Sequence, residues 1–183
     1  GAFLLVSVGS VIAIAIFLDV HGVYPTFSEA LRFSAFNVVS IATTTGYAST
    51  DYALWPMFAP LWMLFLSSFA TSAGSTGGGI KMIRAIVLYK QVYRELTRAM
   101  HPNAIHPVKI GSELVPSNIL FAVLAFGFMY MVCIVSMTLA LSFSGLEIVT
   151  AFTAVVASIN NMGPGLGQVG PATNFGSLSD FQT

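Results

Sequence analysis

Two short polar turns carry the backbone groups of this sequence that could bind an ion. They are TTTGY at residues 43–47 and NNMGPG at residues 160–165. The glycines at 46 and 163 permit the left-handed backbone that lets successive carbonyls face one axis. Rings of backbone carbonyls inside a membrane replace the hydration shell of an alkali cation. Each turn is therefore a candidate filter loop, although threonine, asparagine, glycine and proline also make ordinary extracellular loops.

A third candidate is the glycine-rich segment GSTGGG at residues 74–79. Four glycines in six residues would unwind a helix at this point. The segment could be a mobile intramembrane loop that obstructs or opens a pore, or a flexible break where a helix leaves the membrane. It lacks the spacing of a phosphate-binding P-loop, because Ile80 separates Gly79 from Lys81 and Met82 follows. Its residues are Gly74, Ser75, Thr76, Gly77, Gly78 and Gly79.

The distribution of charge indicates the elements that must position these turns. Hydrophobic residues make up 56% of the chain and charged residues 8%, whereas a soluble domain carries about 25% charged residues. Residues 52–80 and 114–146 contain no Asp, Glu, Lys or Arg. Since about 20 apolar residues cross the hydrocarbon core, the sequence predicts an all-α integral membrane protein in contact with membrane lipid.

Apolar helices of two lengths are expected. The long ones would span the bilayer, whereas helices of about 15 residues are too short to span and are typical of re-entrant segments. Ser28 is the expected N-cap of the first short helix. The expected spanning helices cover residues 1–18, 54–73 and 116–143, and the expected short helices cover residues 28–42 and 145–159. The helix over 54–73 is expected to resume after the glycines as a basic amphipathic helix over 80–98.

The two halves repeat the order of a spanning helix, a short helix and a glycine turn. Val38-Val39 and Val155-Val156 precede Gly46 and Gly163 by the same spacing, with six residues between. Internal repeats are common in membrane transport proteins. We therefore expect a piece of a longer protein, divided into three parts. These are a pore repeat over 1–98, with a broken spanning helix over 54–98, a cytoplasmic linker over 99–115, and a second pore repeat over 116–183 without its last helix.

The basic residues indicate how the chain is oriented. Six of the seven Lys and Arg residues lie between residues 81 and 109. The positive-inside rule places that segment in the cytoplasm and the two candidate filter turns toward the other side. The net charge of zero gives no indication of a nucleic-acid partner.

Other classes of function have less support in the sequence. An intramembrane serine protease built on Ser75 would need a histidine at membrane depth, but His21, His101 and His106 lie outside the predicted spanning cores, so no enzyme is expected. The two linker histidines have no cysteine nearby and indicate no zinc-type site. A tetrameric channel with one filter per chain would not need two unlike turns. A structural scaffold would not need glycine turns placed twice after short helices.

The pattern of helix, pore helix, filter and helix resembles the TrkH/TrkG branch of the Trk/Ktr/HKT potassium transporter superfamily. The likeness rests on TTTGY at 43–47, AGSTGGGIK at 73–81 and NNMGPGLG at 160–167, and it covers nearly all 183 residues in the order of the family. That family arranges four such repeats around one central pore. The chain looks like the third repeat and the fourth without its last helix. The family's pore-facing basic residue lies in that helix. In the family, filter glycines in all four repeats are associated with potassium selectivity, and this chain contains two of them, so permeation by sodium stays an alternative.

The resemblance implies potassium transport across the bacterial inner membrane by the ion-conducting subunit of a Trk-type uptake system. Another monovalent cation (Na/K) channel is the alternative, and channel-like flow and symport both fit. The resemblance implies potassium but no organic cofactor, a homodimer, a cytosolic nucleotide-binding regulatory subunit, and a gating loop over residues 74–79. The implied filter residues are Thr43, Thr44, Thr45, Gly46, Tyr47, Asn160, Asn161, Met162 and Gly163, with potassium at Thr44, Thr45, Asn161 and Met162.

Overall fold

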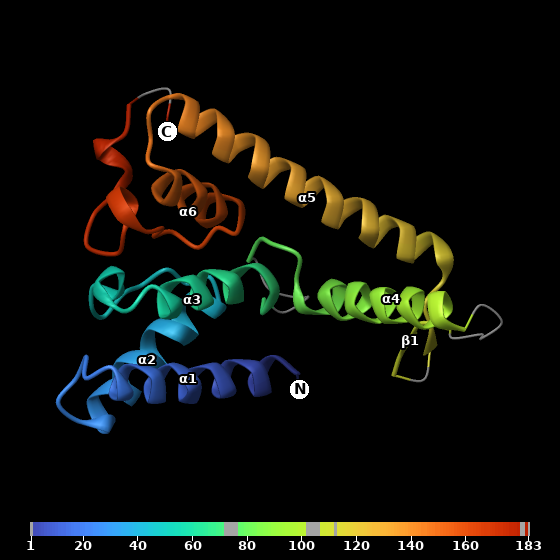
Figure 1. The fold of residues 1–183 in the computed structure, drawn as a ribbon, viewed down its shortest axis with the longest axis horizontal. Helices are drawn as coiled ribbons and strands as arrows, with labels where there is room; N and C mark the ends of the chain where they lie inside the picture. Colours follow the sequence, from blue (N-terminus) through green and yellow to red (C-terminus); the bar gives the residue numbers. More distant parts are fainter. Residues whose placement is uncertain (1, 72–76, 102–106, 112, 180–181, 183) are drawn as a thin grey trace.

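The computed structural model describes residues 2–71, 77–101, 107–111, 113–179 and 182. Figure 1 shows one cluster of helices around α3 and α6, from which α4 and α5 extend together toward a small hairpin. The helices are α1 (Ala2–Val20), α2 (Phe27–Ala42), α3 (Phe58–Phe69), α4 (Met82–Met100), α5 (Ser117–Phe143) and α6 (Ile148–Ile159). Three 3₁₀ turns, η1 (Tyr52–Leu54), η2 (Gly167–Val169) and η3 (Phe175–Ser177), and two strands, β1 (Lys109–Ile110) and β2 (Glu113–Leu114), complete the described chain.

Two helices are long and apolar enough to cross a bilayer. They are α1, with 19 residues, and α5, with 27. At a rise of about 1.5 Å per residue, α5 is long enough to span the hydrocarbon core with some tilt. Large apolar side chains such as Leu5, Phe121 and Phe143 are exposed along them, as expected of surfaces that face lipid or other membrane helices. The bounds of α5 match the predicted helix over 116–143.

The predicted spanning helix over 54–73 is wrong in extent. The α-helix α3 has only 12 residues and begins at Phe58. Residues 52–54 instead form η1, which Asp51 caps by accepting from the Ala53 amide at 3.1 Å. Trp55 then has an extended backbone, with ψ 157°, because a residue that precedes a proline is disfavoured in the helical region. After the glycine segment the next helix begins at Met82 rather than at residue 80.

The start of α2 also differs from the prediction. Its N-cap is Thr26 and not Ser28, and the Thr26 hydroxyl accepts from the Glu29 amide at 3.3 Å. A threonine followed three residues later by a glutamate has the spacing of a capping box. The spacing of Thr26 and Glu29 therefore indicates the correct N-cap, and α2 begins at Phe27.

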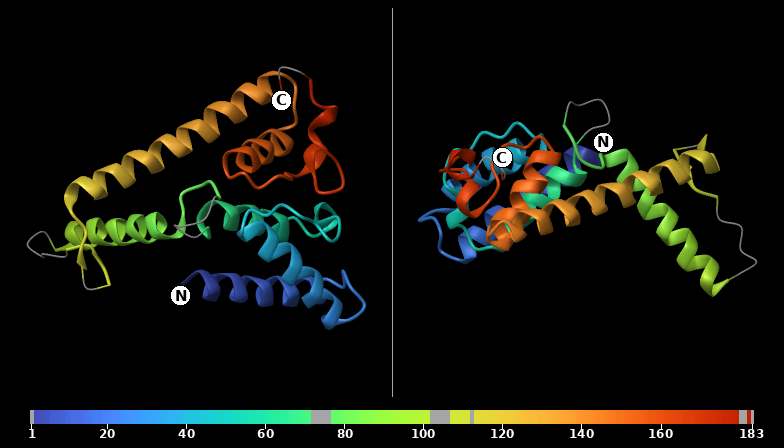
Figure 2. Two further views of the ribbon diagram at one scale, coloured as in Figure 1. Left: turned by 180° about the vertical axis from the view of Figure 1, so that it is seen from behind. Right: turned by 90° about the horizontal axis from the view of Figure 1, so that it is seen from above.

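The predicted linker contains a short antiparallel hairpin, which was not predicted from the sequence. Lys109 pairs with Leu114, and Ile110 pairs with Glu113. The Lys90 ammonium of α4 donates to the Lys109 carbonyl at 2.7 Å and ties the hairpin to the helix. A second, smaller apolar cluster, made of Val87, Val108, Leu120 and Val123, holds the hairpin, α4 and α5 together where Figure 2 shows the two helices crossing.

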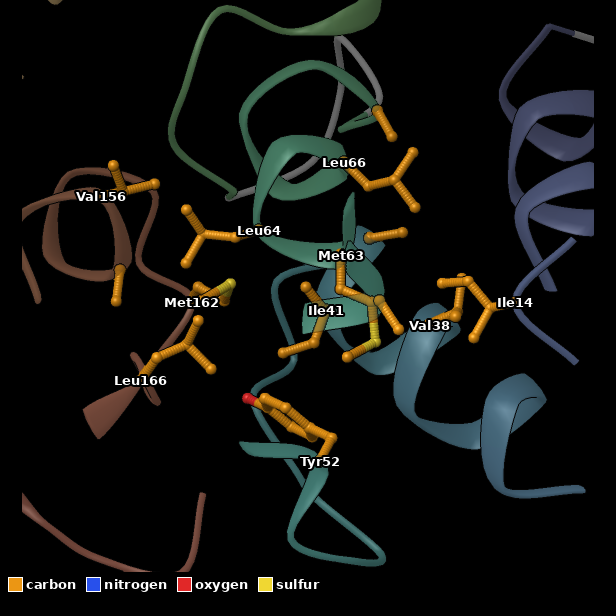
Figure 3. Packing of buried hydrophobic residues seen from close by; sticks show 14 of the residues in the cluster. Ile14, Val38, Ile41, Tyr52, Met63, Leu64, Leu66, Val156, Met162 and Leu166 are labelled. Carbon is orange, nitrogen blue, oxygen red and sulfur yellow. The ribbon is translucent and has the colours of Figure 1, made fainter. Parts of the chain in front are cut away.

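The main core lies where α2, α3 and α6 meet. Figure 3 shows Met63 and Leu64 of α3 between Val38 of α2 on one side and Val156 of α6 on the other, with Ile41 of α2 below them. Met162 and Leu166, which follow α6, complete this core. The core therefore fixes the C-terminal ends of the two short helices, and with them the turns that follow.

Candidate functional site

The first turn ends α2 in a Schellman motif. The amide nitrogens of Thr43, Thr44 and Thr45 turn back to carbonyl oxygens of the last helical turn at 2.8–3.0 Å. Thr44 has a left-handed backbone, with φ 56°, which is uncommon for a β-branched residue. Gly46 follows with φ 83°. The Thr43 hydroxyl donates to the Val39 carbonyl at 2.8 Å and lies 2.8 Å from the Thr45 hydroxyl, so these side chains bond within the turn.

The second turn ends α6 with the same backbone geometry. The amide nitrogens of Asn160, Asn161 and Met162 turn back to carbonyl oxygens at 2.9–3.1 Å, and the acceptors lie four, three and five residues earlier, as they do in the first turn. Asn161 has φ 53° and Gly163 has φ 98°. Two unlike sequences therefore fold into one backbone shape, as expected of an internal repeat.

The two turns contact each other at their glycines. A Cβ built on Gly46 would overlap the Met162 carbonyl oxygen and lie 3.6 Å from Cδ of Pro164. A Cβ built on Gly163 would lie 3.7 Å from Cα of Gly46. The structure thus brings together the two groups of residues that the sequence analysis selected 117 positions apart. The Tyr47 side chain is exposed and stands outside this contact.

Each short helix also carries a polar side chain that hydrogen-bonds to the segment after its turn. On α2, Asn37 is fully buried, donates to the Ser49 hydroxyl at 3.0 Å and accepts from the Ser49 amide at 3.1 Å. On α6, the Thr153 hydroxyl accepts from the Leu166 amide at 2.9 Å. Neither residue was predicted from the sequence, although a polar residue within a short apolar helix was a visible signal.

Replacing Thr153 with valine should lower the free energy of unfolding by about 1–3 kcal/mol, because the buried Leu166 amide would lose its acceptor. Thermal unfolding of the purified protein in detergent measures this change. The matched control is Thr138→Val on α5, since the buried Thr138 hydroxyl has no hydrogen-bond partner among the described residues. Equal losses of stability in both variants would contradict the prediction.

The described part of the glycine segment packs against both turns. A Cβ on Gly77 would lie 2.6 Å from the Thr44 hydroxyl, and a Cβ on Gly78 would overlap the Ile159 carbonyl oxygen. The Gly78 amide donates to the Asn160 carbonyl at 3.0 Å. Only glycine allows an approach this close at these positions. Gly74, Ser75 and Thr76 lie outside the described residues.

Long apolar helices, together with short helices whose ends meet inside the core, define a helical, polytopic membrane protein. The chain belongs to the TrkH family of cation transport proteins, whose model matches residues 4–182. This is a family of cation transporters and not of enzymes. Membership also places the chain in a multi-pass protein of the bacterial inner membrane.

Several proteins of known identity resemble the chain. The Trk system potassium uptake protein TrkH of Salmonella typhimurium is 40% identical over 97% of this chain and 36% of its own length. The Escherichia coli protein TrkG is 35% identical over 98% of this chain and 36% of its own length. The crystal structure of the potassium transporter TrkH from Vibrio parahaemolyticus superposes with a TM-score of 0.90 at 39% identity, covering 99% of this chain and 38% of that one. The chain thus spans little more than a third of these relatives.

Proposed function

We propose that this chain forms part of the ion-conducting path of a bacterial potassium uptake protein. The observation that carries the proposal is the contact of Gly46 with the Met162 carbonyl between two turns of identical backbone geometry. Potassium would bind backbone carbonyls of Thr44 and Thr45 in the first turn, and of Asn161 and Met162 in the second. Thr43, Gly46, Tyr47, Asn160 and Gly163 would complete the two filter loops.

The hydrogen bonding of both turns favours a cation. The first three amide groups of each turn donate back to their own helix, which leaves their carbonyl oxygens to bind an ion, except for the Asn160 carbonyl, which accepts from the Gly78 amide. The C-terminal ends of α2 and α6 both point into the turns, and a helix C-terminus carries a partial negative charge of roughly half an elementary charge. Both effects lower the cost of removing water from a monovalent cation and oppose the entry of an anion.

We propose that residues 74–79 act as the gate of this path. The support comes from residues 77–79, which lie against Thr44 of one turn and Asn160 of the other. A segment this close to both turns would have to move for an ion to pass toward α4. Its glycines permit that movement because they restrict the backbone least.

The complete protein would bring further repeats around the same axis, and we propose a homodimer with a cytosolic nucleotide-binding regulatory subunit. The basic helix α4, with Lys90, Arg94 and Arg98, supports a cytoplasmic position for the face that such a subunit would meet. Transport by a channel and symport coupled to protons or sodium are both compatible with the two turns.

Growth on limiting potassium tests the proposed function. The complete protein that carries this segment is expressed, with its regulatory subunit, in a bacterial strain without potassium uptake. We expect the unaltered protein to restore growth, and the Gly46→Ser/Gly163→Ser double variant to fail or to admit sodium, since neither serine suits a left-handed backbone. Full growth of the double variant would remove the filter assignment. No growth with the unaltered protein at normal membrane levels would count against potassium uptake itself.

A further inference from the structure

A buried polar cluster lies behind the second turn. The Asn160 side chain is fully buried and contacts three hydroxyl groups from two other helices. Its Oδ1 accepts from the Tyr130 hydroxyl of α5 at 2.9 Å. Its Nδ2 donates to the hydroxyls of Ser67 and Ser68, at the end of α3, at 2.9 Å and 3.0 Å. An amide so completely bonded in an apolar core is held in one position, because turning it would leave polar atoms unpaired.

The orientation of this amide follows from a fourth hydrogen bond. The Ser67 hydroxyl donates its proton to the Leu64 carbonyl at 2.7 Å, so toward Asn160 it can only accept. The NH₂ group of Asn160 must therefore face the serines, which leaves its oxygen to face Tyr130. Tyr130 in turn must donate. The cluster has one consistent set of donors and acceptors. An oxygen in place of Nδ2 would face the lone pairs of the Ser67 hydroxyl, and the two oxygens would repel each other.

The same cluster reaches the glycine segment. The Asn160 carbonyl accepts from the Gly78 amide, and a Cβ on Gly79 would lie 2.9 Å from Asn160 Oδ1. The Ser68 carbonyl accepts from the Ile80 amide at 2.9 Å. Asn160 and Ser68 therefore contact the glycine segment and each other, and the cluster joins α3, α5, the segment and the second turn.

We propose that the side chains of Asn160 and Tyr130, which lie behind the second turn, act as positioning groups that set its ion selectivity. This inference rests on the function proposed above. Asn161 and Met162, which would supply the ion ligands, directly follow Asn160, so a rotation of the Asn160 backbone displaces both of their carbonyls. The Tyr130 hydroxyl is joined to the second turn by its hydrogen bond to the Asn160 side chain.

Ion competition during uptake tests the inference. In the complete protein, Tyr130→Phe removes one hydroxyl and should reduce the preference for potassium over sodium by about two- to tenfold, the range that corresponds to one hydrogen bond. Asn160→Asp keeps the shape but places oxygen against Ser67, and its effect should be at least as large. The loss of potassium preference in the double variant should be no larger than in Asn160→Asp alone, because the hydrogen bond that joins Tyr130 to the turn is made with Asn160.

Two further variants separate the outcomes of this experiment. Tyr89→Phe deletes the same hydroxyl from an exposed tyrosine on α4 and should leave the ion preference unchanged. Ser67→Ala, which removes one acceptor of Asn160 Nδ2 together with the hydrogen bond to the Leu64 carbonyl, replaces Asn160→Asp if that variant fails to reach the membrane. Unchanged preference in Tyr130→Phe with normal uptake, or losses that add in the double variant, would overturn the positioning role alone. A wild-type protein that takes up no potassium would overturn the proposed function and this inference with it.

Discussion

Gly46→Ala should reduce potassium uptake more than roughly tenfold, and more strongly than Gly163→Ala. Both substitutions place an alanine in a left-handed backbone, which costs about 1–2 kcal/mol. Only at Gly46 does the new Cβ also overlap the Met162 carbonyl oxygen, one of the proposed ligands. At Gly163 the nearest atom is Cα of Gly46 at 3.7 Å, an ordinary contact. The loss should therefore differ between two glycines that occupy equivalent positions.

Initial rates of rubidium uptake by membranes with equal amounts of each variant measure this difference. Gly9→Ala is the control, because it lies within α1, where a Cβ would meet nothing within 4 Å. Its uptake should equal that of the unaltered protein. Equal losses at Gly46 and Gly163 would show that backbone strain alone is responsible and that the contact between the turns has no role in uptake.

Gly78→Ala should increase the passive flux of rubidium through the complete protein, without its regulatory subunit, by at least roughly fivefold. The added Cβ would overlap the Ile159 carbonyl oxygen and lie 2.8 Å from Cα of Asn160. These are backbone atoms and cannot rotate away, so the glycine segment has to move. Overpacking of this kind costs about 1–3 kcal/mol, which shifts the segment away from the turns and opens the path that it is proposed to obstruct.

Flux into proteoliposomes measures the effect directly. Gly127→Ala on α5 is the control, since its Cβ would make only a 3.5 Å contact with the Leu88 side chain. Reduced flux in Gly78→Ala, with the protein still folded, would contradict the gating role of the segment. It would instead indicate that residues 77–79 support the second turn.

The features that could be predicted from the sequence are those whose causes are local. The absence of charge between residues 114 and 146 gave the position of α5, and the matched spacing of Val39 and Val156 to their glycines identified two turns of the same geometry. The error at the start of α2 was also local, because Thr26 and Glu29 have the spacing of a capping box. The predicted start of α3 was wrong because the length of the apolar segment suggested a continuous helix, whereas Pro56 disfavours a helical backbone at Trp55.

The missed features depend on long-range contacts. Asn160 and Ser67 are 93 residues apart, and no periodicity in either segment indicates that they meet. The hairpin depends on Val108 packing against α4 and α5, which the polar linker sequence does not reveal. The contact of Gly77 and Gly78 with the turns likewise follows from the packing of α3 against α6, and not from the glycine-rich composition.

The two turns share a backbone but not their side chains, and this has a consequence for how such a pore can evolve. In a channel made of identical subunits, one substitution changes every position around the axis at once. Here, a change at Asn161 leaves Thr44 untouched, because each repeat encodes its own loop. Selection can then adjust one turn while the other keeps its shape. The duplicated geometry conserves the backbone of the two turns, and the unlike sequences leave each one free to acquire its own connections to the rest of the protein.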